Sequence, residues 1–457
     1  MKYRYTYPVY NERRFQIMKK LLAALLALIM VLSMGSSAFA ADVELTLWTP
    51  PVFAIGYMDA LYDLIARFEE ANPGVTIEVE ELNWDGIGEK LESAMMTETT
   101  PDIYIDGTAR TAKLPSTALC VDVSDVLETT GNWNEGAINI GKVDDAYYLV
   151  PVTLMPSTIL AVNVDLAKQY GVYEMLPEDR MSWDWEDFMA FLKACGEKSL
   201  TDGVYPIGLF AGSQSSDIAY YTMLLSAGAN VLNADHTEAA INTPEAVQVL
   251  ANVKEIVDNG LTYPGIAEMT DEQVMGVFLN QKVVVDLTLN GGVNGITMFN
   301  EMVTDGLIEK APVVQGYAWP TMNGSATNIG NWGANCAAIF ENEGDEDKIA
   351  AAKDFLAFMA TDKAFNETLW ASAPSYGPAR TMDIELKLED EAMIAEVGAV
   401  THLAAYNNSS FGILESYWGE IRQYFYPNLQ SLVLGNKTPE EAISSFEASV
   451  NEVLQYN

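Results

Sequence analysis

The strongest constraint on the fold is an alternation of strand-like and helix-like patterns that begins near residue 43. Residues 44–48 and 75–79 alternate apolar and polar side chains, which is the periodicity of a half-buried strand. Between them, residues 57–70 place apolar side chains at helical spacing, which indicates a helix with one buried face. A strand, a helix and a strand in this order favour a parallel sheet covered by helices.

The alternation continues along the chain, as six further segments show. Helices are predicted at 87–98, at 184–195, at 243–258 and from 438 onward, and strands are predicted at 103–105 and 282–287. In parallel sheets, ligands lie beyond the carboxyl ends of the strands. Trp48 and Asp106 both follow predicted strands, so we expect them at such an edge.

Residues 18–40 have the pattern of a secretory signal peptide. Basic residues at 19–20 precede an apolar run over 21–32, and the segment ends in Ala38-Phe39-Ala40. The run is too short to span a bilayer. We therefore predict an exported protein that begins at Ala41, with residues 1–17 as an over-called start. No cysteine stands at the end of the apolar run, where a lipid could be attached, so no lipid anchor is expected. The predicted location is the periplasm or another cell-envelope or extracellular space.

Charge narrows the classes of ligand. The 457 residues include 64 acidic and 25 basic side chains, for a formal net charge of −39. Nucleic acids and anionic lipids are bound through clustered Lys and Arg, so neither is an expected partner. A neutral or cationic small molecule is therefore the more suitable ligand for this chain.

The length of the chain predicts two or three folding units. The three widely spaced cysteines, Cys120, Cys195 and Cys336, form no disulfide framework.

Motifs for catalysis are missing from the sequence. The two histidines, His236 and His402, lack neighbouring ligands or nucleophiles, and neither a nucleophile elbow nor a phosphate-binding loop occurs. We therefore predict no catalytic residues, no metal site and no cofactor. A secreted glycosidase stays open as an alternative, because it needs only two carboxylates.

Several short segments, taken in order, resemble the family 1 extracellular solute-binding proteins of ABC transporters, the group that contains maltose-binding protein. The matching segments are residues 45–48, 68–75, 101–103, 144–151, 163–165 and 184–188. The fourth segment departs from the family pattern, with Asp145-Ala146 where glycine and lysine are usual. Together the segments cover most of the chain after the signal peptide.

The resemblance implies an α/β fold, the two-lobed type II clamshell of periplasmic binding proteins, with multiple interlobe crossings. On that basis the first lobe is expected to comprise residues 42–152 plus 321–376. The second lobe is then expected to comprise residues 153–320 plus 377–457. We expect a monomer.

The resemblance also implies a function. The chain is expected to be the exported binding component of an ABC importer, which captures a mono- or oligosaccharide in the interlobe cleft and delivers it to a membrane permease. Two alternatives remain open: the same fold binding a polyamine or another small solute, and the secreted glycosidase.

A sugar site combines aromatic platforms with hydrogen-bonding side chains, often carboxylates. On position and residue type, the candidate ligand-binding residues are Trp48, Trp84, Asp106, Tyr220, Tyr221, Asn290, Trp332, Tyr376 and Arg380.

Each candidate has a structural alternative. Trp48 and Trp84 are equally suited to packing, and Asp106 to capping a turn. Tyr220 and Tyr221 lie on a predicted helix, with one of them expected to face the cleft. Tyr376 is an alternative hinge residue, and Arg380 an alternative interlobe ion-pair partner. Trp185 is expected in the core, because it opens a helix that must pack.

Overall fold

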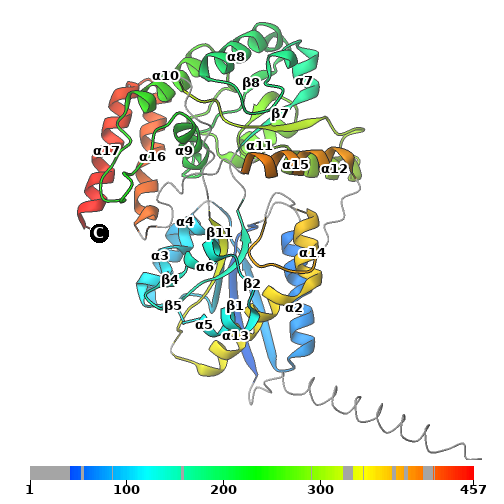
Figure 1. Ribbon diagram of the computed structural model, residues 1–457, viewed down its shortest axis with the longest axis vertical. Helices are drawn as coiled ribbons and strands as arrows, with labels where there is room; N and C mark the ends of the chain where they lie inside the picture. The colour runs from blue at the N-terminus through cyan, green and yellow to red at the C-terminus, as the bar shows by residue number, and fades with distance from the viewer. Residues whose placement is uncertain are drawn as a thin grey trace, which may run out of the picture.

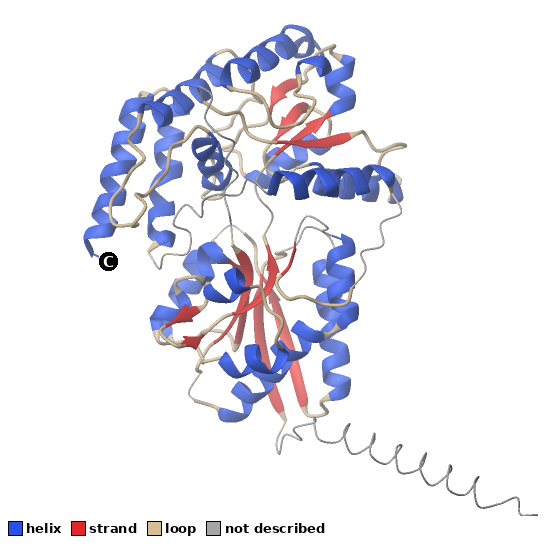
Figure 2. Ribbon diagram, in the orientation of Figure 1, coloured by secondary structure: helices blue, strands red, loops and turns tan. Residues whose placement is uncertain are grey.

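The chain folds into two lobes, each built around one main sheet with helices against it (Figures 1 and 2). The computed structural model describes residues 42–52, 56–84, 86–155, 159–289, 291–322, 333–342, 344–372, 377–384, 390–404, 415 and 417–456. The predicted signal peptide and the candidates Asn290, Trp332 and Tyr376 lie outside these residues.

The first lobe contains a six-stranded sheet of order β12-β6-β11-β3-β1-β2. β1 (Val43–Thr49) pairs in parallel with β2 (Val75–Glu81) and β3 (Ile103–Gly107), as the alternating pattern predicted. The other pairs are antiparallel and join β11 (Ala334–Ile339) to β3 and to β6 (Val150–Leu154), whose outer neighbour is β12 (Gly377–Pro378).

Helices and a small hairpin complete this lobe. They are α2 (Tyr57–Ala71), α3 (Ile87–Thr97), α4 (Thr108–Thr111), η1 (Leu114–Thr117), α5 (Ser124–Thr130), α6 (Glu135–Asn139), α13 (Glu346–Thr361), α14 (Lys363–Ser372) and the hairpin β4 (Lys142–Val143) with β5 (Ala146–Tyr147).

The second lobe contains a four-stranded sheet of order β10-β7-β9-β8. Its strands are β7 (Leu160–Asn163), β8 (Tyr205–Ile207), β9 (Val283–Asp286) and β10 (Val314–Tyr317). The surrounding helices are α7 (Val164–Gln169), η2 (Tyr173–Met175), α8 (Trp185–Ser199), η3 (Leu200–Asp202), α9 (Ser216–Ser226), α10 (Pro244–Asp258), α11 (Asp271–Leu279), α12 (Gly292–Thr304), α15 (Glu391–Ala404), α16 (Trp418–Val433) and α17 (Pro439–Tyr456).

The predicted helix caps explain where two helices of the second lobe begin. The Asp184 carboxylate accepts hydrogen bonds from the backbone N–H groups of Glu186 and Asp187 at the start of α8. Thr243 accepts one from Ala246 at the start of α10. These side chains satisfy N–H groups that have no partner within the helix, which is why the helices begin at these residues.

The chain passes between the sheets at three places, each later than the predicted lobe boundary. β6 extends to Leu154 in the first sheet, past the boundary at 152/153. Thr321 is still held by the second lobe, because its backbone N–H donates to the carbonyl of Trp183. β12 belongs to the first sheet, although residues 377–378 were assigned to the other lobe. The division into lobes beyond these contacts remains a prediction.

Each lobe has its own apolar core. In the first lobe Phe68 of α2 packs edge-on against Phe355 of α13, with ring centroids 5.2 Å apart. In the second lobe Trp183 packs against Phe188 of α8 at 5.0 Å. Trp185 lies in the same core, as predicted, with 3% of its surface exposed. All three cysteines are buried, and none forms a disulfide.

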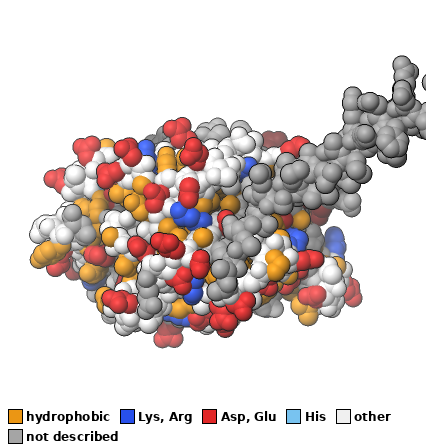
Figure 3. All heavy atoms as spheres, turned by 90° about the horizontal axis from the view of Figure 1, so that it is seen from below, with side chains coloured by type: hydrophobic (Ala, Val, Ile, Leu, Met, Phe, Trp, Pro, Cys, Tyr) orange, Lys and Arg blue, Asp and Glu red, His pale blue; other side chains and the backbone are white. Residues whose placement is uncertain are grey.

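The surface reflects the acidic composition. The end of the first lobe that faces away from the second shows many acidic and fewer basic side chains (Figure 3). Within the described ranges, no helix is both long enough and apolar enough to cross a membrane.

Candidate functional site

A pocket between the two lobes is the candidate functional site, because residues from both lobes form its walls. α4 of the first lobe and α16 of the second lobe contact each other at this place. The lining residues from the first lobe are Gly88, Glu89, Leu91, Glu92, Ala109, Arg110 and Lys113, and those from the second are Gln214, Gly419, Arg422 and Gln423.

The first-lobe wall is organised by Asp106, the last but one residue of β3. Its carboxylate is fully buried and accepts two hydrogen bonds from Arg110, at 2.5 Å from Nε and 2.7 Å from Nη2. It also accepts from the Tyr104 hydroxyl and, at 2.6 Å, from the backbone N–H of Gly107. The Arg110 side chain keeps 16% exposure, so this buried carboxylate presents a fixed guanidinium to the pocket.

The charges of this cluster follow from its burial. Burial works to lower the pKa of Arg110, but the adjacent Asp106 carboxylate outweighs it, and the pKa is raised. Burial and the same carboxylate raise the pKa of Tyr104, which keeps its hydroxyl neutral and able to donate. Arg110 is therefore a permanent cation, and its plane is oriented by its two bonds to Asp106.

The second-lobe wall repeats this arrangement. Arg422 of α16 donates from Nε and Nη2 to the carboxylate of Asp217, which lies on α9, and both side chains are buried. Arg422 lines the interlobe pocket together with Gln214. A buried, bidentate Asp–Arg pair thus stands on each side of the pocket, and each pair is close to neutral as a unit.

Three strand ends meet beside Asp106. Asn335, near the start of β11, pairs with Gly107 and donates a 3.2 Å hydrogen bond to Thr153 of β6. Thr108 exchanges hydrogen bonds with the backbone of Ala334, at 2.7 and 2.8 Å. Gly333 has a φ of +79°, and an added Cβ would lie 2.5 Å from the Thr108 hydroxyl. Glycine at this position is what lets the chain pass so close to α4.

Trp48 and Trp84, two of the predicted ligand-binding residues, lie near the Asp106 cluster. The guanidinium of Arg110 lies 5.2 Å from the ring centroid of the half-buried Trp84. Trp48 is at the same end of the sheet, because its strand pairs with β3 next to Tyr104. The ammonium of Lys90 lies 4.1 Å from the Trp48 ring centroid, so this cation covers one face of the ring. The structure thus brings Trp48, Trp84 and Asp106 to one end of the first lobe.

The prediction for the two tyrosines is wrong in one respect. Tyr220 and Tyr221 do lie on a helix, α9, but neither side chain faces the cleft, since both have 0% exposure. They pack in the second-lobe core, where the Tyr221 ring centroid is 4.8 Å from that of Phe425. Three consecutive residues that follow them, Thr222 to Leu224, are buried as well, which identifies α9 as a helix buried on all sides.

Arg380 lies in the first lobe, and its described contacts contain no interlobe ion pair. Its guanidinium donates hydrogen bonds to the carbonyls of Thr130 and Gly131, at 2.6 to 3.0 Å. These carbonyls end α5, where helix carbonyls lack partners and a cation is favoured. This helix-capping contact accounts for Arg380 without a ligand.

Three candidates, Asn290, Trp332 and Tyr376, lie outside the described residues, but each is followed directly by a described residue, and Gly377 after Tyr376 belongs to β12. Gly333 follows Trp332 directly and contacts Thr108 beside the Asp106 cluster. Asp286 ends β9 four residues before Asn290, and one oxygen of its carboxylate accepts from the backbone N–H groups of Thr288 and Leu289. The described residue after Trp332 thus lies against Thr108, and the described residues before Asn290 are held by the Asp286 carboxylate at the end of β9.

Sequence reasoning missed Arg110 and Arg422. For Arg110 a signal was present, because it stands four residues after Asp106 at the start of a helix, a spacing at which side chains meet. Arg422 gave no local signal, because its partner Asp217 is 205 residues away.

Two observations concern metal-ligating side chains and histidine in the part of the chain that the structure describes. No group of three or more His, Cys, Asp or Glu side chains there is arranged to hold a metal ion. His236 contacts Glu415, with Nδ1 and Oε1 2.7 Å apart.

Comparison with known proteins identifies related chains. A sequence model of the family described as bacterial extracellular solute-binding proteins matches residues 63–384. A protein of Brucella abortus, named only as a candidate binding protein, is 23% identical over 442 residues, which is 96% of this chain and 100% of the relative. The diacetylchitobiose-binding protein of Streptomyces coelicolor is 27% identical over 142 residues, 31% of this chain and 32% of that one.

The fold has solved counterparts. An ABC substrate-binding protein from Listeria monocytogenes, solved in complex with cycloalternan, superposes with a TM-score of 0.73 at 20% identity. The match covers 91% of this chain and 100% of the Listeria chain. The predicted two-lobed clamshell is therefore confirmed as the fold.

Proposed function

The chain belongs to the family of bacterial extracellular solute-binding proteins, and on that premise we propose that it captures a mono- or oligosaccharide between its lobes. The observation that carries the choice of ligand is the pair of bidentate Asp–Arg clusters on opposite walls of the interlobe pocket. Sugar hydroxyls both donate and accept hydrogen bonds, so they suit fixed, charge-assisted donors.

The electrostatics favour a neutral ligand over an anion or a polyamine. Each guanidinium is already neutralised by the carboxylate behind it, and Lys113 pairs with Glu92 at 2.7 Å. The remaining charged residue of the described lining is Glu89. A polyamine would find only one uncompensated carboxylate there, and an anion would meet no uncompensated cation.

The relatives support the same class of ligand. The Streptomyces protein is named for a sugar, and the Listeria protein was solved with one. We further propose that this chain is exported to the periplasm or cell-envelope space without a lipid anchor, that it hands its ligand to an ABC permease, and that it acts as a monomer without catalysis. Closure of the two lobes around the ligand would present the surface that the permease recognises.

Within this proposal the candidate residues have different roles. Arg110 and Arg422 donate to ligand hydroxyls, and Asp106 and Asp217 position them. Trp84 and Trp332 offer aromatic faces to the apolar side of a sugar ring. Asn290 and Tyr376 remain proposed contacts from segments outside the described residues.

A ligand screen tests the proposal. The purified protein is heated with panels of mono- and oligosaccharides, amino acids and polyamines, and hits are titrated by calorimetry. A sugar present at 100 times its Kd should add about 2.7 kcal/mol to the free energy of unfolding. A polyamine as sole hit would keep the fold and replace the ligand. Release of reducing ends from a bound oligosaccharide would instead favour the glycosidase.

A further inference from the structure

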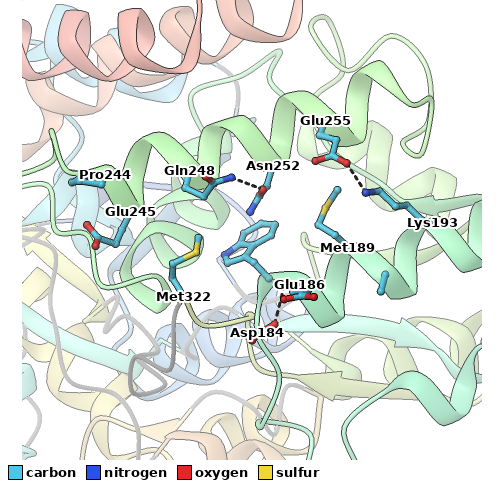
Figure 4. A pocket seen from close by; sticks show the side chains of 12 residues that line it. Asp184, Glu186, Met189, Lys193, Pro244, Glu245, Gln248, Asn252, Glu255 and Met322 are labelled. Atoms are coloured by element: carbon cyan, nitrogen blue, oxygen red, sulfur yellow. Dashed lines mark hydrogen bonds and ion pairs between the residues drawn. The ribbon is translucent and has the colours of Figure 1, made fainter.

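A second cavity lies within the second lobe, between α8 and α10, and shares no lining residue with the interlobe pocket (Figure 4). Its volume is about 620 Å³, which is in the usual range for small-molecule sites. Its described lining residues are Asp184, Trp185, Glu186, Met189, Ala190, Lys193, Pro244, Glu245, Gln248, Asn252, Glu255 and Met322.

One of the lining residues of this cavity, Trp185, carries an unpaired hydrogen-bond donor. Trp185 is 3% exposed, and its indole Nε1 has no hydrogen-bond partner. A buried N–H without a partner costs about 1–3 kcal/mol, so an acceptor atom from a ligand would gain from pairing with it. Met189 and Met322 line the same cavity, and unbranched thioether side chains rearrange at low cost to admit such an atom.

The rim is negatively charged. Four carboxylates line the cavity, from Asp184, Glu186, Glu245 and Glu255, and the single cation, Lys193, pairs with Glu255 at 2.6 Å. Figure 4 shows this pair at one side, with Glu186 and Glu245 apart from it. α8 and α10 both begin at the cavity, and each helix start adds about half a positive charge. About two negative charges therefore remain without compensation.

The cavity also touches a connection between the lobes. The backbone N–H of Trp185 donates to the carbonyl of Thr321 at 3.1 Å, and Met322 follows on the same segment. That segment runs from the last strand of the second sheet toward β11 of the first. A molecule in the cavity would thus contact a part of the chain that leaves its lobe.

We propose that this cavity is an accessory site for a small organic cation that also carries a hydrogen-bond acceptor. The ammonium group faces the carboxylates of Glu186 and Glu245, and a hydroxyl or carbonyl oxygen accepts from Trp185 Nε1. A cation without an acceptor leaves the indole unpaired, and a neutral molecule leaves the rim charge uncompensated. This site is independent of the sugar proposed for the interlobe pocket.

The test uses three probes of nearly equal shape with the full chain. Choline has both the cation and the hydroxyl, tetramethylammonium has only the cation, and 3,3-dimethylbutan-1-ol has only the hydroxyl. The nine tryptophans give indole N–H signals in a ¹H–¹⁵N spectrum, and Trp185→Phe identifies that of Trp185. Choline is expected to shift the Trp185 signal saturably and with the highest affinity. Tetramethylammonium should bind more weakly and leave the indole shift nearly unchanged.

Matched variants test the role of the rim. In the Glu186→Gln/Glu245→Gln variant, the choline affinity should fall about two- to fivefold for each carboxylate, and less at high salt. The control is Glu197→Gln/Glu452→Gln, which removes two exposed carboxylates outside the cavity and should change nothing. The proposal is overturned if choline leaves the Trp185 signal unmoved, if the neutral alcohol binds equally well, or if the two double variants behave alike. Unchanged sugar binding in every variant would separate this site from the interlobe pocket.

Discussion

Arg422 and Asp217 are 205 residues apart in the sequence and form a bidentate ion pair in the second lobe. Nε of Arg422 lies 2.5 Å from Oδ2 of Asp217, and Nη2 lies 3.0 Å from Oδ1. The side chains are 2% and 0% exposed, so neither charge is screened by solvent. The pair joins α16 to α9, and its Arg422 lines the interlobe pocket.

Replacing Arg422 by Met should strongly destabilise the second lobe. The change leaves the carboxylate of Asp217 buried without its partner, and breaking a buried pair in this way costs about 3–5 kcal/mol. Urea-induced unfolding followed by tryptophan fluorescence measures the loss. The double variant Asp217→Asn/Arg422→Met removes both charges and should recover most of the stability. A double variant as unstable as the single one would show that packing, and not charge, dominates here.

Replacing Arg110 by Lys should weaken sugar binding by about 1.5–3 kcal/mol. A hydrogen bond to a charged group is worth about this much, and a lysine cannot reproduce the planar fork that meets both oxygens of Asp106. Calorimetry with the sugar found in the screen measures the affinity. The control is Arg67→Lys, since Arg67 makes a partly exposed single contact to Asp362 on the same lobe. Equal affinities for the two variants would remove Arg110 from the binding site.

Replacing Gly333 by Ala should lower the free energy of unfolding more than replacing Gly435 does. Both residues have left-handed backbones, with φ of +79° and +76°, and each should lose about 1–2 kcal/mol for an L side chain in that region. An alanine Cβ at 333 would also meet the Thr108 hydroxyl at 2.5 Å, whereas nothing lies within 4 Å at 435. Thermal or urea unfolding of both variants gives the difference. If the losses are equal, the close approach to Thr108 does not contribute.

Replacing Asp286 by Asn should change how stability depends on pH. Burial raises the pKa of the Asp286 carboxyl to about 6, against the opposing hydrogen bonds from Thr288 and Leu289. Between about pH 4 and pH 6 the folded chain therefore holds a proton that the unfolded chain has released, and stability falls as the pH rises through this window. The loss amounts to about 2–3 kcal/mol and is complete above the folded pKa.

Urea unfolding of the wild type and Asp286→Asn at several values between pH 4 and pH 7 isolates this effect. All other groups titrate in both proteins, so the difference between their unfolding free energies should move in favour of the variant as the pH rises. A difference that does not vary with pH would mean that Asp286 ionises normally in the folded chain.

Local periodicity and the family resemblance were enough to predict the local elements and the fold. Periodic burial and caps such as Asp184 and Thr243 act within a few residues, so helix starts and strands could be predicted to within a few positions. The two-lobed clamshell was predicted from the resemblance of several short segments to a known family. The placement of Trp48 and Asp106 at one sheet end followed as well, because parallel strands end at a common edge.

Which polar side chains meet depends on how distant segments pack in the folded chain. Arg422 reaches Asp217 because α9 and α16 pack together, and no pattern near either residue carries that information. Tyr220 and Tyr221 are residue types that often bind sugars. They lie, however, on a helix enclosed by α16 and α17, so their rings pack in the core. Burial depends on contacts between segments distant in the chain, and local periodicity reports only which face of an element is apolar.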